Sequence, residues 1–490
     1  MHRILLSLLC ACALIAAAPL DKPAAGGTAW TGKQIIDLRG AIDRILSAPT
    51  MRGAHVGLLV RDTVRGTILY SQNADRDFMP ASNFKLLVGS AALQRLGTTF
   101  TFVTNVASDA APQNGVIGGN LYLHGGGDAH LTAKDLDDAA AALAAQGIKR
   151  VNGALVTDPT RYDSQRYGYG WSWDDLPYYY APVVTALELE EGTVHMTFAP
   201  GTSAGSLATL RVWPQSGAYT IDNELMTGVA GSKDTSDIVR PWDKPGTIQI
   251  TGEYPLSAKE SGEVNPAVPD PESYAGDVFA RALQAHGITV AGGVRDGKMP
   301  ATAALLWSHN SDPMPKLLSE FWYPSDNLMG ELFLKELGVA QAGEPGTDDH
   351  GITLENAYLK SIGVDPDTVT IADGSGLSQY DRITPADLVA ILQADWNGPN
   401  RDVVLDALPV SGVRGTLEHA YIGTAAERQV FAKTGSISHV RTISGFVRTR
   451  THGAITFSFL INNWMGEQQL KGPEALAKVR GDLFSQLAIQ

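Results

Sequence analysis

One helical turn, from Ser82 to Lys85, constrains this chain more than any other feature of its sequence. Pro80 suits the start of a helix, and residues i and i+3 of a helix lie on one face, so the Ser82 hydroxyl and the Lys85 amine are predicted to touch. An alcohol is a nucleophile at neutral pH only when a neighbouring base takes its proton, and a lysine is such a base only when its pKa is depressed. Taken alone, the pattern equally fits a helix N-cap serine followed by a solvated lysine.

Two further motifs supply what a serine–lysine pair requires. Ser325-Asp326-Asn327 follows Tyr323-Pro324 at an expected helix entrance. Lys433-Thr434-Gly435-Ser436 follows the apolar strand Gln429–Ala432, which is expected to present it at a strand end. A second amine near the first raises the cost of keeping either one charged, so Lys433 is expected to lower the pKa of Lys85.

The remaining groups have roles that follow from their chemistry. Ser325 is placed to relay a proton to a leaving amine, and Asn327 to hold Lys85 or a substrate amide. The backbone N–H groups of Ser82 and Ser436 are expected to stabilise the oxyanion of an acyl-transfer intermediate.

The N-terminus is typical of an export signal. Met1-His2-Arg3 is followed by an apolar run to Ala18, which is too short for a comfortable membrane span and ends in small residues. We expect a signal peptide at residues 1–18, with cleavage as late as about residue 27. Both cysteines of the sequence lie inside it. The expected product is a periplasmic protein without disulfides and without stable membrane insertion. A net charge of −14 disfavours nucleic acid as a partner.

The distribution of elements predicts an interrupted domain. Amphipathic helices near both ends (33–48 and 474–487), with hairpins just inside them, indicate that the termini share one domain and that the middle is inserted. Further helices are expected at 133–145, 273–286 and 314–337, and strands at 289–295, 442–448 and 454–461. The expected domains are residues 28–99 with 298–490 as the catalytic domain, residues 100–187 with 251–297 as a second domain, and residues 188–250 as a third, mostly β domain.

The ordered trio of motifs is the signature of penicillin-binding proteins and serine β-lactamases. A separation of 243 residues between Ser82 and Ser325 exceeds what a β-lactamase needs. In this respect the chain resembles the peptidase S13 family, the class C low-molecular-mass penicillin-binding proteins or D-alanyl-D-alanine carboxypeptidase/endopeptidases. Asp373–Ser378, Pro409–Leu417 and Gly170–Leu176 also match the family pattern.

The resemblance implies an α+β fold, with an antiparallel sheet flanked by helices and large, mostly β insertions. It implies a serine-type D-Ala-D-Ala carboxypeptidase or DD-endopeptidase that acts on peptidoglycan stem peptides through an acyl-Ser82 intermediate. β-Lactam antibiotics would acylate the same serine. The choice between carboxypeptidase and endopeptidase stays open, as does the oligomeric state.

The resemblance also assigns residues. Ser82, Lys85, Ser325, Asn327 and Lys433 are the implied catalytic groups, and Thr434, Gly435 and Ser436 the substrate-binding ones. Asp175 is implied to meet the free amino end of diaminopimelate, although a carboxylate that caps the turn before Leu176 fits nearly as well. Two positions depart from the family pattern. Gln379 stands where a basic residue is frequent, and Gly127-Asp128-Ala129 replaces Gly-Asp-Pro.

Several alternatives were weighed against this interpretation. A serine β-lactamase or esterase of the same fold, or a catalytically silent peptidoglycan-binding protein, would keep the fold. His124–Gly127 and Gly201–Gly205 imitate the oxyanion loop and nucleophile elbow of an α/β-hydrolase, but an elbow needs a following helix where this sequence predicts a strand. Neither a metal nor a cofactor is expected, since Asp128 and His130 lack a third ligand nearby.

Overall fold

A five-stranded sheet is built from both ends of the chain. The computed structural model describes residues 20–24, 26–466 and 471–490. The strand order is β19-β20-β21-β1-β2, and all neighbouring strands are antiparallel. β1 pairs with β21 along its whole length, so the two terminal segments form one structural unit. The strands are β1 (His55–Asp62), β2 (Ile68–Gln72), β19 (Val430–Ile437), β20 (Val440–Arg448) and β21 (Ala454–Asn462).

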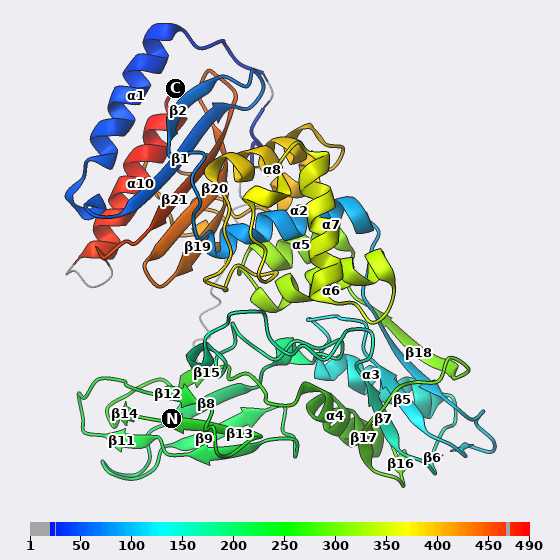
Figure 1. Cartoon of the computed structure of the whole chain (residues 1–490). Helices are drawn as coiled ribbons and strands as arrows, with labels where there is room; N and C mark the ends of the chain where they lie inside the picture. Colours follow the sequence, from blue (N-terminus) through cyan, green and yellow to red (C-terminus); the bar gives the residue numbers. More distant parts are fainter. Residues whose placement is uncertain (1–19, 25, 467–470) are drawn as a thin grey trace, which may run out of the picture.

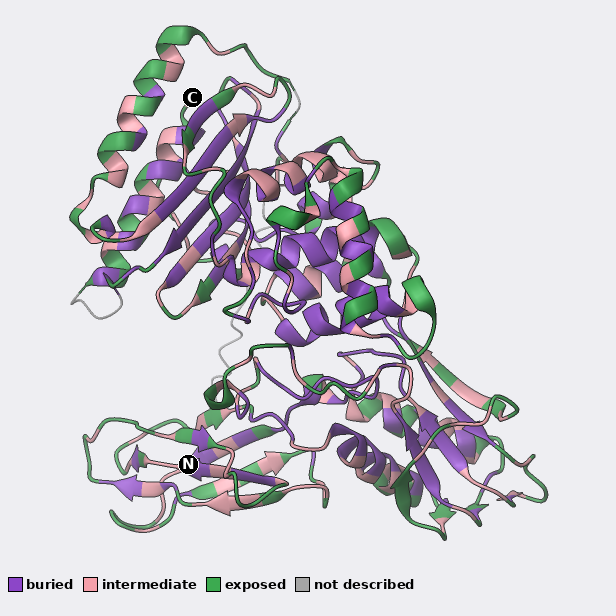
Figure 2. Ribbon diagram, viewed as in Figure 1, coloured by how far each residue is buried: buried purple, intermediate pink, exposed green. Residues whose placement is uncertain are grey.

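Helices cover both faces of this sheet (Figure 1). On one face lie α1 (Gly32–Leu46) and α10 (Gly472–Ala488), whose apolar sides share a core with the strands. Because both faces are covered, every residue of β21 is buried (Figure 2), where a strand with one solvated face would alternate. This architecture confirms the predicted fold class. The second face carries α2 (Lys85–Leu96), α5 (Met314–Trp322), α6 (Asn327–Ala342), α7 (Asp348–Ser361), α8 (Pro385–Asn397) and α9 (Arg401–Ala407).

Helix α2 is the centre of the helical layer. All its residues from Lys85 to Leu93 are buried. The Trp322 indole lies directly against Gly89, where an added Cβ would come within 2.6 Å of the ring. The indole Nε1 also donates to the Lys85 carbonyl at 3.1 Å. The buried Trp322 side chain therefore holds the first turn of α2, which carries the predicted base, in place.

The middle of the chain forms a second body below the helical layer (Figure 1). Its larger sheet has the order β17-β7-β5-β3-β18 and packs against α3 (Ala133–Ala145) and α4 (Pro271–Ala285). β18 pairs with β3, so this sheet extends to Asn310, past the expected end of the insertion at residue 297. Its strands are β3 (Val103–Ser108), β5 (Leu121–His124), β7 (Leu155–Asp158), β17 (Val294–Asp296) and β18 (Ala304–Asn310), and β4 (Val116–Ile117), β6 (Arg150–Val151) and β16 (Thr289–Val290) form a small sheet of order β16-β6-β4.

The mostly β region consists of three small sheets. Their orders are β15-β8-β9, β10-β13-β12 and β11-β14. β15 pairs with β8, so this region includes strand residues beyond the expected boundary at residue 250. Its strands are β8 (His195–Ala199), β9 (Thr209–Trp213), β10 (Thr220–Asn223), β11 (Met226–Gly228), β12 (Asp237–Val239), β13 (Thr247–Thr251), β14 (Glu253–Pro255) and β15 (Gly262–Val264).

Three predicted elements differ from the structure. The helix expected at 314–337 is two helices, because Ser325 adopts a left-handed backbone (φ 69°) and the Asp326 side chain caps the start of α6. The strand expected at 289–295 is two short strands that enter different sheets. The Lys433–Ser436 motif lies inside β19 and not at its end. β19 is an edge strand, so its residues can still face a ligand from within the strand.

The structure also bears on the alternatives. Ser203 lies in a loop between the antiparallel strands β8 and β9, with no helix after it, so it is not a nucleophile elbow.

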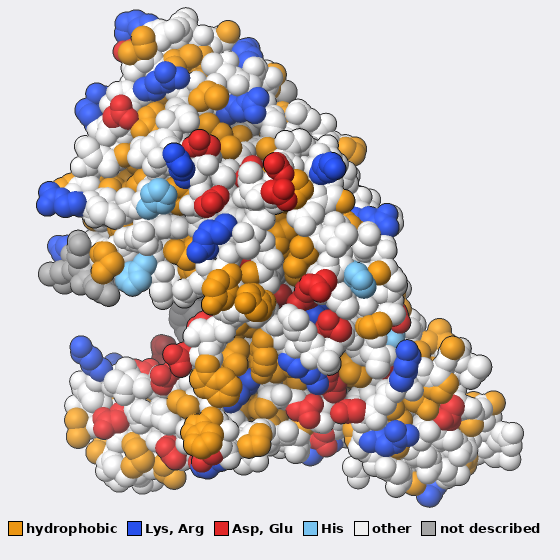
Figure 3. All heavy atoms as spheres, in the orientation of Figure 1, with side chains coloured by type: hydrophobic (Ala, Val, Ile, Leu, Met, Phe, Trp, Pro, Cys, Tyr) orange, Lys and Arg blue, Asp and Glu red, His pale blue; other side chains and the backbone are white. Residues whose placement is uncertain are grey.

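In the ranges that the structure describes, no helix is long and apolar enough to cross a bilayer. The predicted signal segment, residues 1–18, lies outside those ranges. Figure 3 shows acidic and basic side chains interspersed over the visible face, and a hollow between the upper and lower bodies.

Candidate active site

The predicted nucleophile lies on a strained turn. Ser82 belongs to a 3₁₀ turn, Ala81–Phe84, that leads directly into α2. Ala81 has a left-handed φ of 47°, a conformation that costs energy for a non-glycine residue and that gathers at functional sites. Gly376 lies against this turn, and an added Cβ there would come within 2.1 Å of the Ala81 carbonyl oxygen. The strain is thus held in place by close backbone packing.

Lys85 contacts the nucleophile and two neutral oxygen acceptors. Its Nζ lies 3.0 Å from Ser82 Oγ, 2.5 Å from Asn327 Oδ1 and 2.6 Å from the Ser375 carbonyl oxygen. The side chain is fully buried. Burial lowers the pKa of Lys85 to about 8, although the charges of nearby carboxylates, Asp373 first among them, work in the opposite direction. The predicted lowering is present, but its main cause is burial and not the second lysine.

The second lysine of the motifs, Lys433, contacts Ser325. Its Nζ is 2.7 Å from Ser325 Oγ and 2.8 Å from the Thr434 carbonyl oxygen. Burial, with a smaller contribution from the charge of Lys85, holds the pKa of Lys433 well below its usual value. Ser325 therefore stands next to an amine that readily exists in its neutral form.

The nucleophile turn and β19 are joined by close contacts. Asn83 Nδ2 donates to the Lys433 carbonyl oxygen at 3.1 Å. A Cβ at Gly435 would lie 2.9 Å from the Ser82 backbone nitrogen and 2.2 Å from Thr442 Oγ1, so only glycine fits there. This approach brings the open edge of β19 alongside Ser82.

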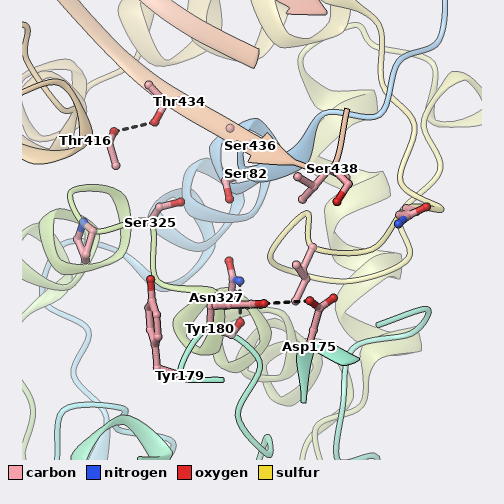
Figure 4. A pocket seen from close by; sticks show the side chains of 15 residues that line it. Ser82, Asp175, Tyr179, Tyr180, Ser325, Asn327, Thr416, Thr434, Ser436 and Ser438 are labelled. Carbon is pink, nitrogen blue, oxygen red and sulfur yellow. Dashed lines mark hydrogen bonds between the residues drawn. The ribbon is translucent and has the colours of Figure 1, made fainter. Parts of the chain in front are cut away.

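These groups line one cavity of about 460 Å³ (Figure 4). Its walls carry Ser82, Ser325, Asn327 and the β19 segment from Thr434 to Ser436. The structure thereby brings together the motif residues predicted from three distant parts of the sequence. Lys85 and Lys433 lie behind this surface and reach it through Ser82 and Ser325.

Asp175 also lines the cavity, on the side of the inserted body. It lies in a short 3₁₀ turn, and its Oδ1 accepts a hydrogen bond from the Tyr180 hydroxyl at 3.0 Å. Among the described residues, no side chain, that of Asp175 included, forms a capping hydrogen bond to this turn. The same segment reaches the catalytic motif, because Asn327 Nδ2 donates to the Tyr180 carbonyl at 2.7 Å.

The Asp373–Ser378 segment is a tight turn, as its sequence indicates. The Asp373 carboxylate accepts from the backbone nitrogens of Ser375, Gly376 and Ser378, which orients the Ser375 carbonyl toward Lys85. Leu377 and Gln379 follow in the cavity wall.

Sequence reasoning missed several lining residues. Thr416 accepts a hydrogen bond from the Thr434 hydroxyl at 2.7 Å, and it lies in the Pro409–Leu417 stretch, which matches the family pattern without indicating a contact with substrate. Tyr179 and Tyr180 follow the Asp175 turn, and nothing in their spacing marks them as cavity residues. Among the described residues, no group of three or more His, Cys, Asp or Glu side chains is arranged to hold a metal ion.

Comparison with known proteins agrees with this geometry. Residues 38–481 match the D-Ala-D-Ala carboxypeptidase 3 (S13) family. A D-alanyl-D-alanine carboxypeptidase from Actinomadura sp. (strain R39) is 36% identical over 461 residues, which cover 91% of this chain and 85% of that protein. The D-alanyl-D-alanine carboxypeptidase DacB of Haemophilus influenzae is 26% identical over 443 residues, 89% of this chain and 91% of that protein.

The fold agrees as well. The crystal structure of penicillin binding protein 4 (dacB) from Haemophilus influenzae has a TM-score of 0.82 and 25% identity, and the match covers 93% of this chain and 99% of that one. The chain belongs to the D-Ala-D-Ala carboxypeptidase 3 (S13) family.

Proposed function

We propose that this chain is a serine-type D-Ala-D-Ala carboxypeptidase, with DD-endopeptidase activity on peptidoglycan cross-links, that works through an acyl-Ser82 intermediate. One observation carries the proposal. A buried lysine with a pKa near 8 lies 3.0 Å from a serine hydroxyl, on a strained turn that faces an open cavity. At neutral pH such a lysine has an accessible neutral form, which is what a general base requires.

Acylation begins with proton transfer from Ser82 Oγ to neutral Lys85. The oxygen attacks the carbonyl carbon of the penultimate D-Ala, and negative charge develops on the carbonyl oxygen. The backbone N–H groups of Ser82 and Ser436 donate hydrogen bonds to this oxyanion. The support for this arrangement is the close approach of β19 to the nucleophile turn at Gly435.

Collapse of the intermediate breaks the peptide bond, and the leaving amine takes a proton from Ser325. The proton that Lys85 took from Ser82 replaces it by way of Lys433, whose Nζ is 2.7 Å from Ser325 Oγ, so both lysines are neutral again before deacylation. The leaving group is D-Ala in the carboxypeptidase reaction and a cross-linked stem peptide in the endopeptidase reaction. Water then attacks the acyl-enzyme, with Lys85 again accepting a proton, and Ser82 is regenerated.

Substrate binding uses the edge of β19 and the cavity rim. An extended peptide pairs with the open edge of β19 near Thr434 and Ser436, while Asn327 holds the amide next to the reacting bond. Asp175 receives the free amino group of diaminopimelate. Its support is its position in the cavity wall and the fact that its recorded partner is a hydroxyl and not a cation.

The remaining assignments belong to the same proposal. Residues 1–18 direct export, and the enzyme acts in the periplasm on stem peptides and is acylated there by β-lactams. Residues 28–99 and 298–490 make up the catalytic domain, apart from β18, which pairs within the inserted sheet.

Two alternatives predict different behaviour with a penicillin. A β-lactamase would release the hydrolysed drug quickly, whereas this chain is expected to keep it, since no Glu-x-x-x-Asn-type segment that could supply a deacylation base stands out at short range after Ser82. A silent binding protein would not react at all.

Digestion of defined muropeptides tests the proposal. Purified protein is incubated with a stem pentapeptide and with a cross-linked dimer, and the products are identified by mass spectrometry. We expect D-Ala from the first and two separated stem peptides from the second, with neither product from Ser82→Ala. If the wild-type protein leaves both substrates intact, the proposal fails.

A further inference from the structure

His130 comes from the inserted body and lies against the start of α6. It follows the Gly127-Asp128-Ala129 segment, which departs from the family pattern, and is one member of the Asp128/His130 pair. Its Nε2 lies 3.2 Å from the Met329 sulfur, and Met329 donates its backbone N–H to the Asp326 cap of α6 at 3.2 Å. A histidine of the insertion therefore contacts the helix turn that carries Asn327.

Three carboxylates surround this imidazole. Nδ1 lies 3.5 Å from Glu191 Oε1, and Nε2 lies 3.7 Å from Glu320 Oε2 on α5. Asp326, in the turn between α5 and α6, contributes the third charge. Two carboxylates thus contact the ring and a third adds its charge, so a positively charged imidazole is attracted to all three.

The segment that presents Glu191 is itself held in a strained conformation. Glu190 and Glu191 both have left-handed backbone angles (φ 51° and 56°). Their N–H groups donate to the carbonyls of Leu131 and Ala129, one on each side of His130. This paired contact fixes the carboxylate beside the ring, and conformations of this cost persist where the surrounding structure enforces them.

The turn that His130 faces is the one that must hold Ser325 and Asn327 in place. Ser325 also has a left-handed φ, 69°, and no glycine eases that turn. We propose that His130, as an imidazolium paired with Glu191 and Glu320 and attracted by the charge of Asp326, is a positioning residue that fixes the Ser325–Asn327 turn and makes the acylation rate depend on the inserted body. This inference rests on the proposed function.

The proposed role of His130 holds only in the pH range in which its imidazole is charged. Burial opposes the charged form, but the hydrogen bond to Glu191 and the charges of Asp326, Glu320 and Glu191 raise the pKa of His130 to about 9. Other titratable groups nearby are Lys316, paired with Glu320, Asp128 with its partner His309, and Glu190 and His195, which line the same cavity as His130. The ring edge lines a cavity of about 320 Å³ between the insertion's loops, so protons can exchange with solvent.

Acylation is then fastest when Lys85 is neutral, a form that predominates above about pH 8, and His130 is charged, a form that predominates below about pH 9. The acylation rate of the wild-type protein should therefore rise to a maximum and fall on the alkaline side. Removing Glu191 removes the contact that raises the pKa of His130, so the alkaline fall should move to lower pH in Glu191→Gln.

The test measures the rate of acylation by a fluorescent penicillin from pH 6 to 10.5 in the full-length protein. In His130→Gln we expect a rate lower by about fivefold at the wild-type maximum, an effect typical of coupling between sites, and no alkaline fall with a midpoint near 9. The matched control is His286→Gln, which breaks a surface ion pair with Asp137 within the insertion and should keep the wild-type profile.

The outcomes separate the two proposals. A wild-type protein that is not acylated at any pH contradicts the proposed function. A wild-type protein that is acylated, with an alkaline fall that stays unchanged in both His130→Gln and Glu191→Gln, contradicts the role of His130. If His130→Gln does not fold, the direction of the shift in Glu191→Gln decides, because that side chain is largely exposed and its loss should be tolerated.

Discussion

Two buried lysines of the helical layer, Lys85 on α2 and Lys335 on α6, have opposite electrostatic environments. Both side chains are almost fully buried. Lys335 Nζ lies 2.8 Å from Asp163 Oδ1 and 2.8 Å from Asp348 Oδ1. Burial alone would lower its pKa, but these two carboxylates raise it above the ordinary lysine value. Lys85 instead contacts a hydroxyl, an amide oxygen and a carbonyl, and burial lowers its pKa to about 8.

The comparison shows that burial by itself does not make a lysine a base. What matters is whether the first contacts of the amine carry charge, because an anionic partner favours the protonated form and a neutral oxygen favours it much less. Lys335 is paired with carboxylates and joins α6 to Asp163 of the inserted body, whereas the neutral contacts of Lys85 suit its proposed role as a base. Substitutions at Lys85, Asn327 and Lys335 can therefore separate the effect of charge on a buried lysine from the effect of burial.

Removal of the base should have the largest effect. Lys85→Met keeps the length of the side chain and takes away the amine. Because general-base catalysis contributes about 10²–10⁴ in rate, we expect acylation by a penicillin to slow by roughly 10³. The unfolding temperature should not fall, since the substitution removes a buried amine without an anionic partner at hydrogen-bond distance. Acylation at the wild-type rate would contradict the assignment of Lys85 as base.

An anionic partner should raise the pKa of Lys85 and make its electrostatic environment resemble that of Lys335. Asn327→Asp places a carboxylate at the position now 2.5 Å from Lys85 Nζ. An adjacent opposite charge shifts a pKa by about 1–3 units, so acylation at pH 7 should fall by roughly 10–100-fold. The acid limb of the rate profile, which has its midpoint near pH 8 in the wild-type protein, should move to higher pH.

A pH profile of the Asn327→Asp variant separates this effect from simple damage. A lower rate with an unchanged midpoint would mean that the amide acts only by holding substrate. Asn327→Ala is the matched variant, since it removes the amide without adding a charge.

Removal of the structural cation should affect stability and leave chemistry intact. Lys335→Met leaves Asp163 and Asp348 without their shared partner. Breaking a buried ion pair costs about 3–5 kcal/mol, and because Asp163 is partly exposed we expect roughly 2–3 kcal/mol here. Urea unfolding measures the loss, and the acylation rate of the folded protein should stay within about twofold of wild type. A loss of acylation without a loss of stability would reverse the comparison.

The smallest effect concerns a carboxylate outside the lysine pair. Unlike Asp163 and Asp348, Asp175 has a hydroxyl as its recorded partner, so it is open to a substrate ammonium group. Asp175→Asn should raise the KM for a stem peptide with a free diaminopimelate amine by about threefold, as expected for an exposed ion pair. The same variant should react with penicillin, which lacks that amine, at the wild-type rate. An equal loss toward both compounds would indicate a structural role.

The sequence predicted the contact between the proposed nucleophile and base because local spacing determines their geometry. Ser82 and Lys85 are one turn apart, and such a contact follows from helix geometry alone. The Lys85–Ser375 contact could not be predicted in the same way, since a backbone carbonyl has no residue signature and depends on how the Asp373 turn is oriented. The main cause of the lowered pKa of Lys85 was also missed, because burial depends on packing from distant segments.

The boundary between the two bodies was hard to predict because it also depends on contacts between segments far apart in the sequence. β18 lies within the range expected for the catalytic domain, yet it completes the inserted sheet by pairing with β3, about 200 residues earlier. The environment of His130 could not be predicted from the sequence, because the carboxylates that contact it lie far away along the chain. Long-range pairing, unlike helix spacing, leaves little trace in a single sequence.

The central claim is that Ser82 is the nucleophile and that Lys85 activates it. Peptide mapping by mass spectrometry after brief exposure to a penicillin tests this most directly. The account predicts one penicilloyl group per chain, on the peptide that contains Ser82, absent from Ser82→Ala and strongly reduced in Lys85→Met. An adduct on another residue, or an equal adduct in Ser82→Ala, would contradict it.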